Sequence, residues 1–143
     1  MDYKKTTAFC GLDCFNCELY EGNAHTEARK ALDARVPQLT GVACKGCRDQ
    51  GGCVLSPTPC ATRECAVSKN VSFCFDCEEF PCSRLNPTAD QAGKYPHNLK
   101  IFNLCRIRSV GLEAWASEAQ SIRKRYFGGA FRLGDTPVTE EAE

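Results

Sequence analysis

The chain has 143 residues, a formal net charge of zero and twelve cysteines. A chain of this length forms a single domain, and its neutral charge excludes a whole-molecule attraction to nucleic acid or to membrane surfaces. Leu, Ile, Val and Phe account for only 28 of the 143 residues, so the apolar core must be modest and something else must help to stabilise the fold. The cysteines are the best candidates for that role.

The N-terminal segment carries Lys4 and Lys5, but no apolar stretch follows them as it would in a secretory signal. No other segment has the uninterrupted apolar length that a membrane span requires. We therefore expect a cytoplasmic protein, in a reducing compartment where disulfides are rare.

The first cysteines form the motif Cys10-Gly-Leu-Asp-Cys14-Phe-Asn-Cys17. Radical S-adenosylmethionine enzymes use the same three-then-two spacing. Their barrels need a strand–helix alternation that is missing from this chain, so the motif alone is weak support for that chemistry.

A helix is expected next, at about 23–35, because Pro37 ends a run with helical periodicity. Its apolar positions are Ala24, Ala28, Ala31 and Leu32. Residues 40–82 are dense in Gly, Pro, Ser and Cys and have no sustained period, which predicts turns, short strand pieces and a single turn of helix.

Three cysteine pairs have a spacing that suits metal binding: Cys14 and Cys17, Cys44 and Cys47, Cys74 and Cys77. Two thiolates on one tight turn can occupy two corners of a tetrahedron around a single ion. The residue before each second cysteine is Asn16, Gly46 or Asp76, and these types tolerate a left-handed backbone. The candidate metal ligands are all eleven cysteines of this region: Cys10, Cys14, Cys17, Cys44, Cys47, Cys53, Cys60, Cys65, Cys74, Cys77 and Cys82.

Zinc is the expected cofactor, as two or more ions, because an all-cysteine supply fits closed structural sites. One structural zinc contributes on the order of 10 kcal/mol, comparable with the net stability of a whole domain. An iron–sulfur cluster also uses four thiolates, and the spacing does not exclude it. Disulfides fit the even cysteine count, but the missing secretory signal and the three closely spaced pairs count against them. Interleaved cations such as Arg48 and Lys69 could offset thiolate charge.

The remaining candidates for ligation are less well supported. His25 and His97 do not lie at ligand spacing from a cysteine pair. Cys105 falls outside the cysteine-rich region, beside Leu104, and we expect it to be a small buried apolar residue.

Two helices are expected after a connector at residues 87–96. Asn98 is the predicted N-cap of the first, Gly111 a break, and Gly128 with Gly129 the end of the second. The apolar positions have helical spacing on both sides of the break: Leu99, Ile101, Phe102, Leu104, Ile107, Val110, Leu112, Trp115, Ala119, Ile122 and Tyr126.

The predicted fold is small, metal-stabilised and mainly α-helical, with irregular cysteine-rich loops and short strands. Residues 8–86 form a cysteine-rich metal-binding block, and residues 97–130 a helical extension packed on it. Residues 131–143 are predicted to be a frayed tail.

The ordered cysteine series resembles the domain-of-unknown-function 3795 family over residues 8–85. The resemblance implies a small zinc-binding protein of a bacterium or an archaeon, but no established activity. It implies ten ligands, with Cys53 less securely matched. The segments that carry it are Cys10-Gly-Leu-Asp-Cys14-x-x-Cys17, Cys44-x-Gly-Cys47, Cys60-Ala-Thr-Arg63-Glu-Cys65-Ala and Cys74-x-x-Cys77-Glu-Glu-Phe-Pro-Cys82.

The residues favour a non-catalytic zinc module that binds a protein partner, with Trp115, Phe127 and Phe131 as candidate anchors. An enzyme is disfavoured because we find no Ser/His/Asp or Cys/His arrangement and no phosphate-binding glycine loop. No catalytic residue is predicted.

Two alternatives stay open. An exposed thiol of low pKa, or an iron–sulfur cluster, would make this a redox protein. Nucleic-acid binding is the other, because residues 94–134 contain eight basic side chains against Glu113 and Glu118. These basic residues are Lys94, Lys100, Arg106, Arg108, Arg123, Lys124, Arg125 and Arg132.

Overall fold

The computed structural model describes residues 1–56, 58–85 and 98–128, and this part of the chain is mainly helical. The predicted connector at 87–96 and the predicted tail at 131–143 lie outside it. The α-helices are α1 (Tyr3–Thr6), α2 (Glu27–Arg35), α3 (Cys47–Gln50), α4 (Ala61–Ser68), α6 (Leu99–Val110) and α7 (Leu112–Gly128). Single turns of 3-10 helix join them: η1 (Cys14–Asn16), η2 (Glu21–Asn23), η3 (Pro37–Leu39), η4 (Cys74–Asp76) and η5 (Ser83–Leu85).

In place of the expected short strands, the described residues contain a single isolated β-bridge. Tyr20 and Cys44 form an isolated parallel bridge, and no sheet accompanies it. No helix in the described ranges is long and apolar enough to cross a membrane.

The two C-terminal helices begin and end where the sequence predicts. The Asn98 side chain accepts a hydrogen bond from the Ile101 amide at 3.1 Å, which caps α6. Gly111 has a φ of +88° and separates α6 from α7. A left-handed backbone of this kind favours glycine, so the break needs this residue type.

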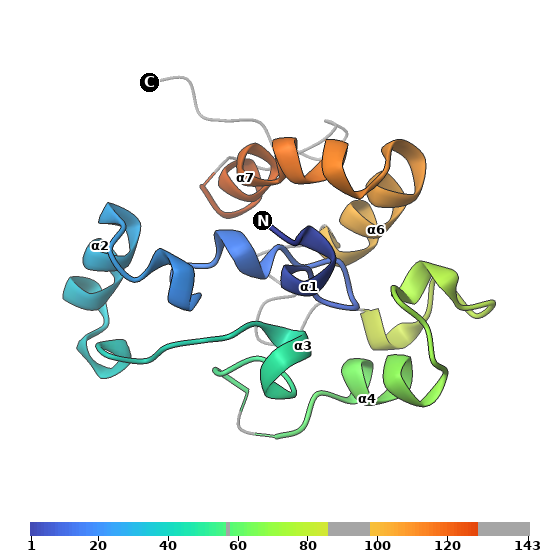
Figure 1. Cartoon of the computed structure of the whole chain (residues 1–143), viewed down its shortest axis with the longest axis horizontal. Helices are drawn as coiled ribbons and strands as arrows, with labels where there is room; N and C mark the ends of the chain where they lie inside the picture. Colours follow the sequence, from blue (N-terminus) through green and yellow to red (C-terminus); the bar gives the residue numbers. More distant parts are fainter. Residues whose placement is uncertain (57, 86–97, 129–143) are drawn as a thin grey trace.

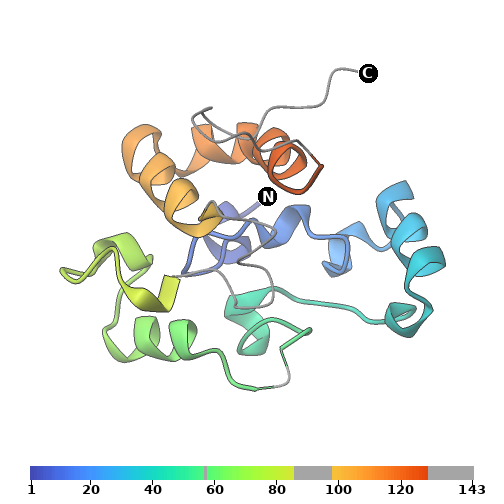
Figure 2. The same cartoon turned by 180° about the vertical axis from the view of Figure 1, so that it is seen from behind.

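The largest apolar core lies between α7, α6 and the first turn of the cysteine-rich block. Trp115 is fully buried, and its ring meets the ring of Phe15 of η1 edge-to-face at 5.9 Å. A smaller cluster of Phe73, Leu85 and Leu104 joins α6 to the end of the block. In Figure 1, α1 lies in the middle, with α6 and α7 on one side of it and with α3 and α4 on the other. Helix α2 projects from one end of the molecule. Figure 2 shows the same order from behind.

The helix expected at 23–35 is shorter and is not amphipathic in the predicted way. It begins at Glu27, because the Thr26 hydroxyl caps the Arg29 amide at 3.2 Å. Ala24, Ala28 and Ala31 are exposed, and Arg29 is the buried residue of α2.

The buried guanidinium of Arg29 connects α2 to the following segment. It pairs with Asp33 at 2.8 Å and donates to the carbonyl oxygens of Val42 and Leu39 at 2.8 and 3.1 Å. Alanine side chains bury little area, so the alanine stripe was a weak basis for a buried face.

The prediction that Cys105 is buried is wrong. Leu99, Asn103, Leu104 and Ile107 form the buried face of α6, and Cys105 is exposed. Neighbouring residues on a helix are about 100° apart, which turns Cys105 away from the face that contains Leu104.

Candidate metal-binding sites

All twelve cysteines are free thiols. Nine are partly buried, Cys44 is buried, and Cys53 and Cys105 are exposed. Exposure therefore separates Cys53 from the other ten cysteines of the block, in line with its weaker support from the sequence.

Four of the predicted ligands line one small pocket. Cys65 lies in α4, Cys74 and Cys77 lie in and just after η4, and Cys82 lies just before η5. The pocket has a volume of about 30 Å³, and Leu85, which is fully buried, forms part of its wall.

A cation lies beside these thiols. Lys69 Nζ is 3.5 Å from Cys77 Sγ and 2.6 Å from Glu79 Oε1. A positive charge at this position would offset part of the negative charge of clustered thiolates, as the interleaved cations of the sequence suggest.

Two local features bring Cys65 and Cys74 to the same pocket. Asn70 has a φ of +53°, and after it the Val71 amide returns to the Ala66 carbonyl at 3.1 Å, which reverses the chain at the end of α4. Cys74 then begins η4, whose Asp76 carboxylate accepts from the Phe73 amide at 2.9 Å.

The sequence suggested a left-handed backbone at the residue before the second cysteine of all three pairs, but only one of these residues has it. Gly46 has a φ of +93°, whereas Asn16 and Asp76 do not have a positive φ. Their side chains instead make local hydrogen bonds: Asn16 donates to Asp13 Oδ2 at 3.1 Å, and Asp76 accepts from Phe73. Asn and Asp are favoured in such turns for this second reason as well.

Burial raises the pKa of the Cys74 thiol to about 12, and the nearby thiol of Cys10 adds to the shift. Burial also raises the pKa of Cys14 to about 12 and that of Cys47 to about 11. With no cation bound, these three thiols are protonated at neutral pH and are poor nucleophiles. A metal ion would bind them only by displacing their protons.

The donors fit zinc by chemistry, because clustered cysteine sulfurs are the ligands that structural zinc prefers. Within residues 1–56, 58–85 and 98–128, however, no three Cys, His, Asp or Glu side chains already converge closely enough to hold an ion. Ligation therefore requires the thiols around the pocket to turn toward a common point. His25 is exposed, and His97 lies outside the described residues.

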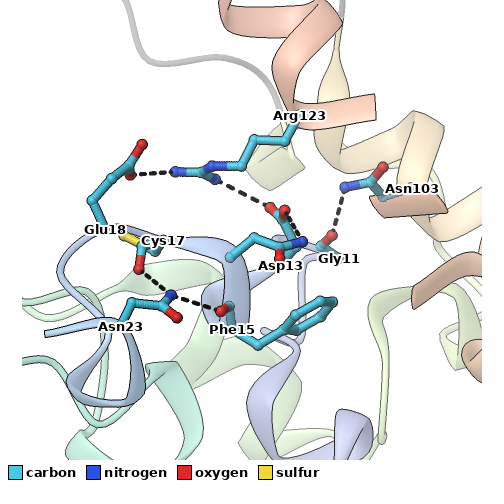
Figure 3. A network of polar contacts seen from close by, with 9 residues as sticks. Gly11, Asp13, Phe15, Cys17, Glu18, Asn23, Asn103 and Arg123 are labelled. Carbon is cyan, nitrogen blue, oxygen red and sulfur yellow. Dashed lines mark hydrogen bonds and ion pairs between the residues drawn. The ribbon is translucent and has the colours of Figure 1, made fainter. Parts of the chain in front are cut away.

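An ion-pair network that the sequence did not predict joins α7 to the first cysteine loop (Figure 3). Arg123 donates to Asp13 Oδ1 at 3.2 Å and to Glu18 Oε2 at 3.1 Å. Asp13 is 2 % exposed, and burial raises the pKa of its carboxyl group while Arg123 opposes that shift.

A second contact holds α6 against the same loop. Asn103 is 2 % exposed and donates to the Gly11 carbonyl at 2.8 Å (Figure 3). Gly11 has a φ of +83°, and a Cβ there would lie 3.0 Å from Leu104 Cγ. The glycine between Cys10 and Leu12 thus permits α6 to approach the cysteine loop.

The family comparison agrees with the resemblance seen in the sequence. A model of the family described as protein of unknown function (DUF3795) matches residues 6–87, which include every cysteine from Cys10 to Cys82. No curated protein and no solved structure matches the chain. The matched range covers more than half of the 143 residues. The chain therefore belongs to the DUF3795 family of proteins of unknown function.

Proposed function

We propose that this protein is a non-catalytic structural zinc protein of the cytoplasm. The observation that carries the proposal is the pocket lined by Cys65, Cys74, Cys77 and Cys82. A supply of four cysteines and no histidine is typical of closed structural sites rather than of catalytic ones, which keep an open position. So many free thiols also suit a reducing compartment.

The scarcity of buried side chains in the middle of the block supports a structural role for the metal. Between residues 20 and 72, the described part of the chain buries only the side chains of Arg29, Cys44 and Ala66. A structural zinc contributes on the order of 10 kcal/mol, which exceeds what these three side chains can supply.

The proposed biological role is to present a rigid surface to a protein partner. Exposed apolar side chains occur next to the cysteines, with Leu55 at 55 % and Val67 at 52 % exposure. Trp115 is fully buried and so belongs to the core rather than to a binding surface, whereas Phe127 is 47 % exposed. Phe131 lies outside the described residues.

Nucleic-acid binding has less support than the basic composition of residues 94–134 suggested. Arg106 forms an ion pair with Glu118 at 2.8 Å, and Arg123 pairs with Asp13 and Glu18. These two guanidinium groups are engaged within the protein, which reduces the positive charge left for phosphates.

The test is metal analysis of protein purified anaerobically, together with an absorption spectrum. We expect a colourless protein with stoichiometric zinc that loses zinc in the double variant Cys65→Ser/Cys82→Ser. The matched control is Cys105→Ser, which removes an exposed thiol outside the block and should leave the zinc content unchanged. Visible absorbance that bleaches on reduction would identify an iron–sulfur protein instead.

A further inference from the structure

Arg48 of α3 connects the segment before Cys10 to the segment before Cys74. Its Nε donates to the Thr7 carbonyl at 2.7 Å, and a terminal guanidinium nitrogen donates to the Ser72 carbonyl at 2.6 Å. These acceptors lie 41 and 24 residues away from Arg48 in the sequence. The guanidinium group is planar and its donors have fixed directions, so the two carbonyls are fixed relative to each other.

Two aromatic rings hold the same guanidinium group. The guanidinium carbon of Arg48 lies 4.0 Å from the centre of the Phe9 ring and 5.0 Å from that of the Phe73 ring. Phe73 is 5 % exposed, and its ring stacks on that of Phe75 at 5.3 Å. A cation at these distances is attracted by the face of an aromatic ring, and burial strengthens the attraction. Arg48 is therefore fixed in one place, and it fixes Phe73 in turn.

The segment that Arg48 holds leads directly into Cys74, which lines the pocket. The carbonyl of Ser72 and the ring of Phe73 contact Arg48. The Cys74 amide donates to the Phe9 carbonyl at 2.9 Å. Three consecutive residues are thus attached either to Arg48 or to the segment that Arg48 binds. Because the backbone sets the direction in which a side chain leaves it, these attachments orient Cys74.

The opposite wall of the pocket is held in a different way. Cys65 lies on α4, and the Thr62 hydroxyl of the same helix donates to the Arg84 carbonyl of η5 at 2.8 Å. This bond connects α4 to the segment that begins just after Cys82. Two separate sets of contacts therefore place Cys74 on one side and the pair of Cys65 and Cys82 on the other.

We propose that Arg48 is a positioning residue for the metal site of this pocket. Arg48 is not a ligand, because its guanidinium group stays protonated and can only donate hydrogen bonds. It holds the backbone of Cys74 so that rotation of the side chain alone brings the sulfur to the ion. The inference rests on the proposed function, since it needs a metal ion in the pocket. It adds that metal binding depends on α3, a helix that contributes no residue to the pocket wall.

The test loads the full-length chain with cobalt(II), which occupies thiolate sites as zinc does and absorbs visible light in bands that report the arrangement of its ligands. The bands of the pocket are those lost in Cys65→Ser/Cys82→Ser. In Arg48→Met we expect these bands to change and the affinity of the pocket for the ion to fall by about 10–100-fold. Arg48→Lys should behave in the same way, because lysine keeps the charge but lacks the planar pair of donors.

Lys45→Met is the matched control, because Lys45 is an exposed cation of the same segment, on the other side of Cys47. It should leave the bands and the affinity unchanged. If Arg48 had a purely structural role, Arg48→Met would lower the denaturant midpoint and leave the bands of the folded, cobalt-loaded protein as they are, and that result would overturn the inference. An equal effect of Lys45→Met would overturn it too, because charge alone would then explain the loss.

Phe9→Leu keeps the inference testable if Arg48→Met does not fold. It removes the aromatic ring nearer to the guanidinium group and leaves both carbonyl acceptors in place. The bands of the pocket should change in the same direction but by less, and unchanged bands would overturn the inference. A chain with no cobalt-dependent bands, or one whose bands all survive in Cys65→Ser/Cys82→Ser, would refute the proposed function instead.

Discussion

The middle of the cysteine-rich block, residues 20–72, and the α6–α7 helix pair differ in how many side chains they bury. The pair buries eight side chains within residues 98–128, whereas the described residues from 20 to 72 bury three. Those of the pair are mostly large and apolar: Leu99, Asn103, Leu104, Ile107, Trp115, Ala116, Ala119 and Ile122. The helix pair can therefore rely on hydrophobic burial, whereas the proposed zinc ions would supply the cross-links between segments that residues 20–72 otherwise lack. In the reducing compartment that we propose for this protein, metal ions would be the available cross-links.

Removing zinc should have the largest effect and should separate the two regions. We expect a strong chelator to make residues 40–70 sensitive to protease while residues 98–128 stay comparatively protected, because each structural zinc contributes on the order of 10 kcal/mol. Limited proteolysis with mass spectrometry measures this directly. Returning zinc should restore resistance, and equal sensitivity of the block before and after chelation would contradict the contrast.

Replacing Trp115 should destabilise the helix pair without removing metal. Trp115 is fully buried against Phe15, and truncating such a side chain costs about 3–5 kcal/mol. Denaturant unfolding of zinc-loaded Trp115→Ala measures the loss. The matched control, Phe127→Ala, removes a ring that is 47 % exposed and lies 5.0 Å from the Tyr126 ring and 5.1 Å from the Arg123 guanidinium, so it should cost only about 1 kcal/mol. A drop in zinc content for Trp115→Ala would mean that the two regions are not stabilised independently.

The sequence was most informative where one physical signal dominates. Asn98, Gly111 and the apolar spacing around Trp115 predicted α6 and α7, because capping and helical periodicity are local properties. The same reasoning failed for α2, whose alanine stripe is exposed while Arg29 is buried by carbonyl partners 10 and 13 residues away. Distant partners leave no local pattern.

The candidate sites show the same limit. Spacing identified the cysteines as a class, but it grouped neighbours such as Cys14 with Cys17, whereas the pocket combines Cys65 with Cys74 through the turn at Asn70. The pairing of Arg123 with Asp13 spans 110 residues and has no signature in the sequence. Which thiols share an ion depends on how irregular loops fold, and periodicity does not describe such loops.

The connection between the two regions can be tested at Arg123. Arg123→Met leaves the carboxylate of Asp13 buried without its cation, and breaking a buried pair in this way costs about 3 kcal/mol. The double variant Asp13→Asn/Arg123→Met should recover part of that loss, because no unpaired charge remains. Denaturant midpoints of the two single variants and the double variant give the coupling energy. If the losses of the two single variants simply added up in the double variant, the pair of Asp13 and Arg123 would contribute no coupling energy between α7 and the cysteine loop.

The smallest effect is expected when the N-cap of α2 in the block and the N-cap of α6 in the helix pair are each replaced by alanine. Asn98→Ala removes the cap of α6 and also the bond from Asn98 Nδ2 to the Leu85 carbonyl at 2.7 Å, so it should lower global stability by about 1–2 kcal/mol. Thr26→Ala removes the cap of α2 at the edge of the molecule, where the helix makes few buried contacts. Its loss should appear as faster hydrogen exchange within α2, with little change in the global unfolding midpoint, because the end of the block opens locally. An equal fall in global stability for both variants would mean that α2 unfolds together with the α6–α7 core, and the proposed division between a burial-stabilised and a metal-stabilised region would no longer hold.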